Sequence, residues 1–215
     1  MSGLAEVAAR HKLQSGGATV EQTRAVVLLI HGRGASAASI LQLGEAIGVE
    51  GLCYLAPQAH GFTWYPHSFM APQAANEPFL SAALARVEAI IADLLDAGLA
   101  AERLAVAGFS QGACVTAETV LRHPRPYGFV GILSGGAIGP PGTPRNYRGT
   151  LATVPVFLGC SDHDPHIPLA RVKETTALYR AMGAEVTERI YPGSMHGVNE
   201  DEILHLRQGL SRLTG

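Results

Sequence analysis

The chain has 215 residues, of which 47% are hydrophobic and 16% are charged, and its formal net charge is -2. A chain of this length buries about 70% of its unfolded surface in one core, so we expect a single domain over residues 1–215. A nearly balanced charge without blocks of one sign argues against nucleic acid and against an anionic membrane surface as partners.

The cysteine content and the length of the apolar runs indicate in which cellular compartment the protein is expected. Cys53, Cys114 and Cys160 are odd in number and lie in apolar or helical patterns, which suits buried free thiols in a reducing environment. The amino-terminal residues lack the apolar core of a signal peptide, and no run approaches the roughly 18 apolar residues of a membrane span. We therefore expect a cytoplasmic protein.

The first clear elements follow a mixed segment, residues 1–24, which suits at most one or two short edge strands. Ala25–Ile30 is a continuous aliphatic run, typical of a strand buried on both faces, and it leads into a glycine-rich turn, residues 31–34. Ser36 suits the N-cap of a helix that ends near Ile47, and residues 52–56 form the next buried run. The order is strand, helix, strand.

A long connection, residues 58–78, is rich in proline, glycine and aromatic residues. Loops of this length are usually functional or disordered, and the aromatic content argues against disorder. Helical spacing of apolar residues then runs from Pro78 to Gly98, and a short apolar strand follows over residues 104–109.

The remaining chain continues the alternation of helices and buried strands. Helices are expected at 111–123, 167–182 and 199–213, strands at 129–133, 154–158 and 185–191, and an irregular loop at 137–153. This pattern predicts an α/β fold with a mainly parallel sheet covered by helices on both faces. Such sheets place ligands at the carboxyl ends of their strands.

The strand at 104–109 ends in Gly108-Phe109-Ser110-Gln111-Gly112, a Gly-x-Ser-x-Gly pattern between a strand and a helix. This pattern is the nucleophile elbow, in which a sharp turn forces the serine into strained backbone geometry and leaves little room on either side. Ser110 is therefore the candidate nucleophile.

A serine hydroxyl needs a base, and the base needs a carboxylate that fixes its tautomer. Asp162 and Asp164 follow the strand at 154–158, and His196 follows the strand that ends at Tyr191. The order serine, aspartate, histidine is the one associated with α/β-hydrolases.

These motifs resemble the phospholipase/carboxylesterase family of small α/β-hydrolases, which includes bacterial carboxylesterases and acyl-protein thioesterases. The resemblance rests on His31-Gly32-Arg33-Gly34, Gly108-Phe109-Ser110-Gln111-Gly112, Asp164-Pro165-His166-Ile167-Pro168 and Tyr191-Pro192-Gly193-Ser194-Met195-His196. It implies an α/β-hydrolase fold without a large cap domain, because the loop at 137–153 is too short to form one. It also implies a hydrolase of small carboxylic esters, with thioesters or lysophospholipids as further candidate substrates, that needs no cofactor or metal and allows for a homodimer.

The resemblance also implies roles for individual residues. Ser110 would be the nucleophile, Asp164 the orienting acid and His196 the base, the backbone N–H groups of Arg33 and Gln111 would form the oxyanion hole, and Trp64, Tyr65 and Phe69 would help to line the acyl pocket. Arg33 stands where many relatives have an apolar residue and places a cation near the pocket mouth. We expect Arg33 and the loop at 58–78 to decide the substrate.

Several other interpretations compete with these roles. Asp162 competes with Asp164, and the acidic and histidine residues of 162–166 could instead bind a metal. His31 suits a strand-end residue that hydrogen-bonds the turn, and Cys114 suits a small core residue within the helix. The alternative function is a non-catalytic hydrolase-fold protein that binds a small aromatic ligand. A dienelactone-type hydrolase is less consistent, because such enzymes are expected to carry cysteine at the elbow.

Overall fold

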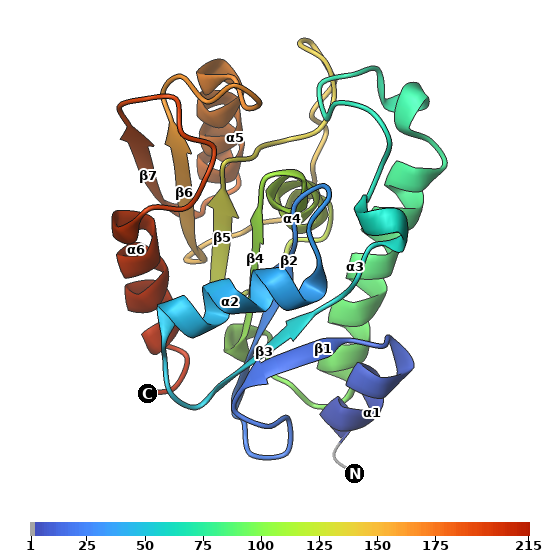
Figure 1. Ribbon diagram of the computed structural model, residues 1–215, viewed down its shortest axis with the longest axis vertical. Coiled ribbons are helices and arrows are strands. Elements are labelled where there is room, and N and C mark those ends of the chain that lie inside the picture. Colours follow the sequence, from blue (N-terminus) through green and yellow to red (C-terminus); the bar gives the residue numbers. More distant parts are fainter. Residues whose placement is uncertain (1–2) are drawn as a thin grey trace.

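The computed structural model describes residues 3–215, over which seven strands form one sheet in the order β1-β3-β2-β4-β5-β6-β7. Every neighbouring pair is parallel except β1 and β3. The strands are β1 (Gln14–Gly17), β2 (Ala25–Ile30), β3 (Leu52–Ala56), β4 (Leu104–Phe109), β5 (Phe129–Leu133), β6 (Pro155–Ser161) and β7 (Glu185–Tyr191). The parallel strands point toward one end of the molecule, the upper end in Figure 1.

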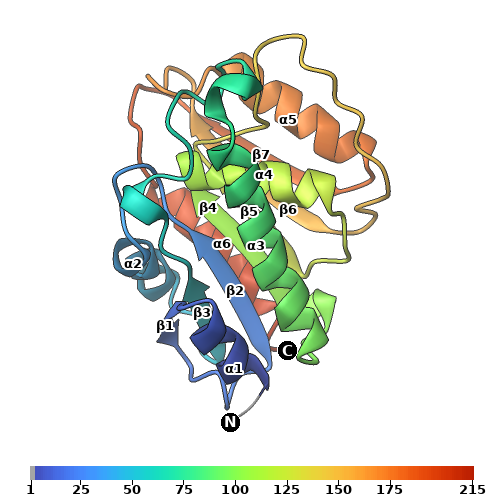
Figure 2. The same ribbon diagram turned by 90° about the vertical axis from the view of Figure 1, so that its right-hand side faces the viewer.

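Helices cover both faces of this sheet. They are α1 (Gly3–Arg10), α2 (Ala37–Ile47), α3 (Phe79–Asp96), α4 (Gln111–Arg122), α5 (Leu169–Ala181) and α6 (Glu200–Ser211). Figure 2 shows α3, α4 and α5 on the side of the sheet nearest the viewer, with α2 and α6 on the other side. The predicted α/β-hydrolase architecture is therefore confirmed.

The central strand β2 shows why the sheet needs two helical layers. All six of its residues are buried, and successive side chains alternate between the two faces. Val26, Leu28 and Ile30 pack into the core beneath α3 and α4. Val27 and Leu29 pack into the core beneath α2 and α6. The side chains of a strand point alternately to the two faces of the sheet, so a continuous aliphatic run places apolar side chains on both faces. Both faces must therefore be covered.

The amino-terminal segment departs from the expectation of edge strands alone. α1 precedes the single edge strand β1, buries Val7 and packs against α3. Arg10 and His11 both reach Asp93 of α3, at 2.9 and 2.8 Å. Beside the other edge strand, β7, strand β6 extends to Ser161 instead of residue 158, because its pairing with β7 continues to Tyr191.

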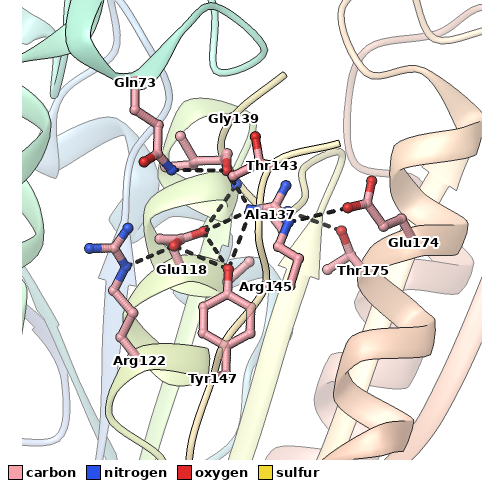
Figure 3. Close-up of polar contacts among 12 residues, drawn as sticks. Gln73, Glu118, Arg122, Ala137, Gly139, Thr143, Arg145, Tyr147, Glu174 and Thr175 are labelled. Carbon is pink, nitrogen blue, oxygen red and sulfur yellow. Dashed lines mark hydrogen bonds and ion pairs between the residues drawn. The ribbon is translucent and has the colours of Figure 1, made fainter. Parts of the chain in front are cut away.

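The connection between β5 and β6 contains no helix or strand over residues 137–153, so it forms no large cap. A buried cluster around Glu118 of α4 holds this loop instead (Figure 3). The Glu118 carboxylate accepts hydrogen bonds from the Arg122 side chain, the Ile138 amide and the Tyr147 hydroxyl at 2.7–3.1 Å. Arg145 contacts both Glu118 and Glu174 of α5, so a polar network replaces regular secondary structure here.

Within residues 3–215, no helix combines the length and the apolar character needed to cross a bilayer.

Candidate active site

Ser110 lies between the end of β4 and the start of α4 in a strained backbone conformation, with φ 54° and ψ -119°. A positive φ in a residue with a side chain persists only where the surrounding structure enforces it. A Cβ at Gly108 would overlap the Gly112 carbonyl, and a Cβ at Gly112 would overlap the carbonyl oxygens of Ile30 and His31. Both glycines of the pattern are therefore sterically required.

The structure brings Ser110, His196 and Asp164 into one hydrogen-bonded chain. The Nε2 atom of His196 lies 2.9 Å from Ser110 Oγ, and its Nδ1 atom lies 2.7 Å from Asp164 Oδ2. The three residues come from the loops after β4, β7 and β6, all at the carboxyl end of the sheet. The His196 side chain is 18% exposed, whereas that of Asp164 is fully buried.

Asp164 is held as a carboxylate by its neighbours. Burial opposes its ionisation, but the hydrogen bonds from His196 and from the amides of His166 and Ile167 outweigh burial and lower the pKa of Asp164. The two amides lie 2.8 and 3.0 Å from Oδ1, which leaves Oδ2 for the imidazole. This geometry fixes the position of the acceptor that faces His196.

Asp162 points elsewhere. Its Oδ1 atom lies 2.7 Å from Nδ1 of His163 and accepts a hydrogen bond from the Gly193 amide at 2.8 Å. These contacts join the loop after β6 to the loop after β7. In residues 3–215 no three histidine, cysteine, aspartate or glutamate side chains gather as metal ligands, and the residues of 162–166 form separate pairs.

The backbone N–H groups of Arg33 and Gln111, two residues that line the same cavity as Ser110, have no hydrogen-bond partner within residues 3–215. The Gln111 amide is the first of α4, where no preceding helical carbonyl can accept from it. In the glycine-rich turn after β2, Gly34 donates to Phe62 and Ala35 to Gly32, so the Arg33 amide stays unpaired there. Unpaired amides of this kind can stabilise a developing oxyanion.

Ser110 and His196 open into a cavity of about 540 Å³. Tyr65 and Phe69 of the long connection line it, as expected from the sequence. Trp64 does not. Its indole N–H donates to the His31 carbonyl at 2.8 Å, and its ring lines a separate cavity of about 350 Å³ near α3. Trp64 is therefore not among the residues that line the cavity of Ser110, and its expected role in the acyl pocket stays a prediction.

His31 is fully buried and holds the loop that follows β3. Its Nδ1 atom lies 2.7 Å from the Gly32 carbonyl, and its Nε2 atom accepts from the Ala59 amide at 3.1 Å. Burial lowers the pKa of His31, which favours the neutral imidazole that this acceptor role requires. His31 is thus a strand-end residue that organises the turn, as its position in the sequence indicates.

A comparison with protein families matches residues 17–213 to the phospholipase/carboxylesterase model. The chain belongs to the phospholipase/carboxylesterase family. Among solved structures, it is similar to a phospholipase/carboxylesterase from Dyadobacter fermentans, with 38% identity and a TM-score of 0.88, over 92% of this chain and 95% of that one. Esterase PE8 shares the fold at 22% identity, with a TM-score of 0.78.

Two curated relatives in this family are yeast proteins named acyl-protein thioesterase 1. The protein from Debaryomyces hansenii is 32% identical over 48% of this chain and 45% of its own length. The protein from Saccharomyces cerevisiae is 27% identical over 54% of this chain and 52% of its own length. The matched region thus spans about half the length of each of these relatives.

Some cavity residues of this family member were not singled out from the sequence as lining residues. His166 lines the cavity, and its ring lies 4.7 Å from the His196 ring in an edge-on arrangement. His166 lies two residues after Asp164 in the same sequence motif, and this proximity to a candidate catalytic residue is the sequence signal that could have identified it as a cavity residue. Cys114 also lines the cavity, and burial raises the pKa of its thiol to about 12, which keeps the thiol protonated.

The side chain of Gln111 also has a structural role that the motif does not reveal. Its Oε1 atom accepts from the Trp64 amide at 3.0 Å and from the Thr63 hydroxyl at 3.2 Å. Its Nε2 atom donates to the Tyr65 carbonyl at 2.8 Å. The residue after the serine thus anchors the cavity wall with its side chain, while its amide has no hydrogen-bond partner within residues 3–215.

Proposed function

We propose that this protein hydrolyses carboxylic esters through an acyl-enzyme formed on Ser110. The observation that carries the proposal is the hydrogen-bonded chain from Ser110 Oγ through the His196 imidazole to Asp164. Membership of a hydrolase family supports the same reaction class. The unpaired amides of Arg33 and Gln111 add the electrostatic element that acyl transfer requires.

The first half of the reaction forms the acyl-enzyme. His196 Nε2 accepts the Ser110 proton as Oγ attacks the ester carbonyl, and the amides of Arg33 and Gln111 stabilise the resulting oxyanion. The imidazolium then gives this proton to the leaving alcohol as the bond between the carbonyl carbon and that oxygen breaks. In the second half, water attacks the acyl-enzyme with His196 again as base, and Ser110 recovers its proton.

Asp164 makes this proton transfer directional. A carboxylate facing Nδ1 holds the proton of the neutral imidazole on that nitrogen, so Nε2 is left as the acceptor for Ser110. The same carboxylate stabilises the imidazolium that forms during attack. Thioesters and lysophospholipids would react by the same steps, and the similarity to acyl-protein thioesterases makes thioesters the first additional class to assay.

The test is covalent labelling of the purified protein by a fluorophosphonate, combined with hydrolysis of short p-nitrophenyl esters and matched thioesters. We expect labelling at Ser110 and loss of both labelling and hydrolysis in Ser110→Ala, with the far-UV circular dichroism spectrum unchanged. Ser15→Ala is the matched control, because Ser15 is exposed in the edge strand β1 and lies outside the residues that line the cavity. Ester binding by the wild type without labelling or turnover would instead support the non-catalytic binding protein.

A further inference from the structure

The guanidinium of Arg33 stands at the cavity that contains Ser110, and its contacts are all with neutral groups. It donates to the Thr63 hydroxyl at 3.1 Å and to the carbonyls of Pro66 and His67 at 2.8 and 2.7 Å. It also lies 5.9 Å from the centre of the Tyr65 ring. Arg33 forms no ion pair within the part of the chain that the structure describes, so its charge is not neutralised by protein.

The surroundings of Arg33 carry no compensating charge. None of the residues that line the cavity within 3–215 is an aspartate or a glutamate. Asp164 lies behind His196 with a fully buried side chain and is already paired. The rings of His67 and His166, which also line the cavity, have no hydrogen-bond partner in the described chain. The cavity therefore offers cationic and polar donor groups without an anion.

We propose that Arg33 is a specificity residue that selects esters carrying an anionic oxygen group, such as a carboxylate, close to the scissile bond. This inference rests on the proposed ester hydrolysis. The Arg33 amide faces the reacting carbonyl in that mechanism, so the side chain of the same residue contacts a substituent of the substrate near that carbonyl. A guanidinium binds a carboxylate with up to two parallel hydrogen bonds, and within residues 3–215 only three of the five N–H groups of Arg33 have partners.

Arg33 also fastens the loop at residues 63–67, so its removal would affect every substrate to some extent. A ratio of two rate constants separates the effect of losing the cation from the effect of loosening the loop. For each variant, kcat/KM for an anionic ester is divided by kcat/KM for a neutral ester of the same shape. A displaced loop lowers both values, whereas loss of the cation lowers mainly the numerator.

The substrates are two matched pairs. The first pair is p-nitrophenyl adipate and p-nitrophenyl hexanoate, which differ by a carboxylate at the end of the acyl chain. The second pair is p-acetoxybenzoate and its methyl ester, which differ by a carboxylate on the leaving group. The pair that shows discrimination identifies the side of the scissile bond that faces Arg33.

The variants are Arg33→Lys and Arg33→Gln, which both lose the planar guanidinium but differ in charge. We expect the wild type to prefer the anionic member of one pair and Arg33→Lys to keep most of this preference. In Arg33→Gln the ratio of kcat/KM for the anionic ester to kcat/KM for the neutral ester should fall about tenfold. The preference should also weaken between low and high salt, because Arg33 is exposed and its charge is screened.

Hydrolysis by the wild type with no preference for either anionic ester overturns the inference and leaves the proposed function standing. A ratio in Arg33→Gln that equals the wild-type ratio also overturns it, because Arg33 then acts only as a loop anchor. Failure of the wild type to hydrolyse any of the four esters, together with absent fluorophosphonate labelling, overturns the proposed function and this inference with it.

Discussion

The amide of Gly139 donates a hydrogen bond of 2.7 Å to the carbonyl of Phe69, and this bond joins the loop at 137–153 to the cavity wall. Arg171 of α5 strengthens the junction, because its guanidinium donates to the carbonyls of Ala137 and Gly139 and lies 5.8 Å from the centre of the Phe69 ring. The wall beside Ser110 therefore depends on a loop without regular secondary structure.

The Glu118 cluster should account for much of the stability of that loop. Replacing Glu118 by leucine leaves the Ile138 amide and the Tyr147 hydroxyl without their acceptor and removes one of the two carboxylates beside Arg145, so we expect a loss of about 3–5 kcal/mol in the free energy of unfolding. Arg122→Ala removes a partner whose side chain is 40% exposed and should cost about 1 kcal/mol or less. Urea unfolding measures both values, and similar losses in the two variants would contradict this role of Glu118.

Asp164 and Asp162 should differ sharply in their effect on the rate. Asp164→Asn removes the carboxylate that faces His196 Nδ1 and favours the wrong tautomer, so we expect kcat to fall by about 10⁴-fold, the size of that effect in serine proteases. Asp162→Asn keeps an oxygen that can accept from the Gly193 amide and should change kcat by about tenfold at most. Steady-state ester hydrolysis measures both, and the reverse order would assign the orienting role to Asp162.

Glu202 provides a pH-dependent prediction that is independent of catalysis. Burial raises the pKa of its carboxyl group to about 7, and one carboxyl oxygen, Oε1, is buried within residues 3–215 without a hydrogen-bond partner. The folded state thus binds this proton more tightly than the unfolded state, in which the pKa is near 4.5. Stability from this group is therefore fully present below pH 4.5 and is lost as the pH rises toward 7.

In Glu202→Gln this loss should be absent. The variant should exceed the wild type in free energy of unfolding above pH 7 by roughly 2–3 kcal/mol, and the difference should shrink toward pH 5. Glu200→Gln, at an exposed position of the same helix, is the control. Urea unfolding at pH 5, 6, 7 and 8 measures the trend, and a pH-independent difference between Glu202→Gln and the wild type would contradict it.

The sequence could predict the parts of the structure that depend on local patterns. The aliphatic run Ala25–Ile30 has no stable place except a two-sided sheet, and the glycines around Ser110 are required by the turn itself. The orientation of Trp64 could not be predicted, because a hydrogen bond to the distant His31 carbonyl decides it. The Glu118 cluster was equally invisible, since its partners come from a loop with no periodic pattern.

The side chain of Gln111 shows how one residue can affect both the loop and the reaction. In Gln111→Ala the amide beside Ser110 remains, but the hydrogen bonds to Thr63, Trp64 and Tyr65 are lost. Each such bond contributes about 1 kcal/mol, so the loop that forms the cavity wall should loosen while the reacting groups stay in place. We expect KM for p-nitrophenyl esters to rise about tenfold, with a smaller change in kcat.

Gln73→Ala is the matched control for this prediction, because Gln73 donates a single long hydrogen bond of 3.4 Å to the Ile138 carbonyl and should change KM by less than about threefold. Fluorophosphonate labelling of Ser110 should persist in both variants, since neither substitution removes a group of the reacting chain. If Gln111→Ala lowered kcat as strongly as it raised KM, the side chain would be contributing to the transition state as well as holding the wall.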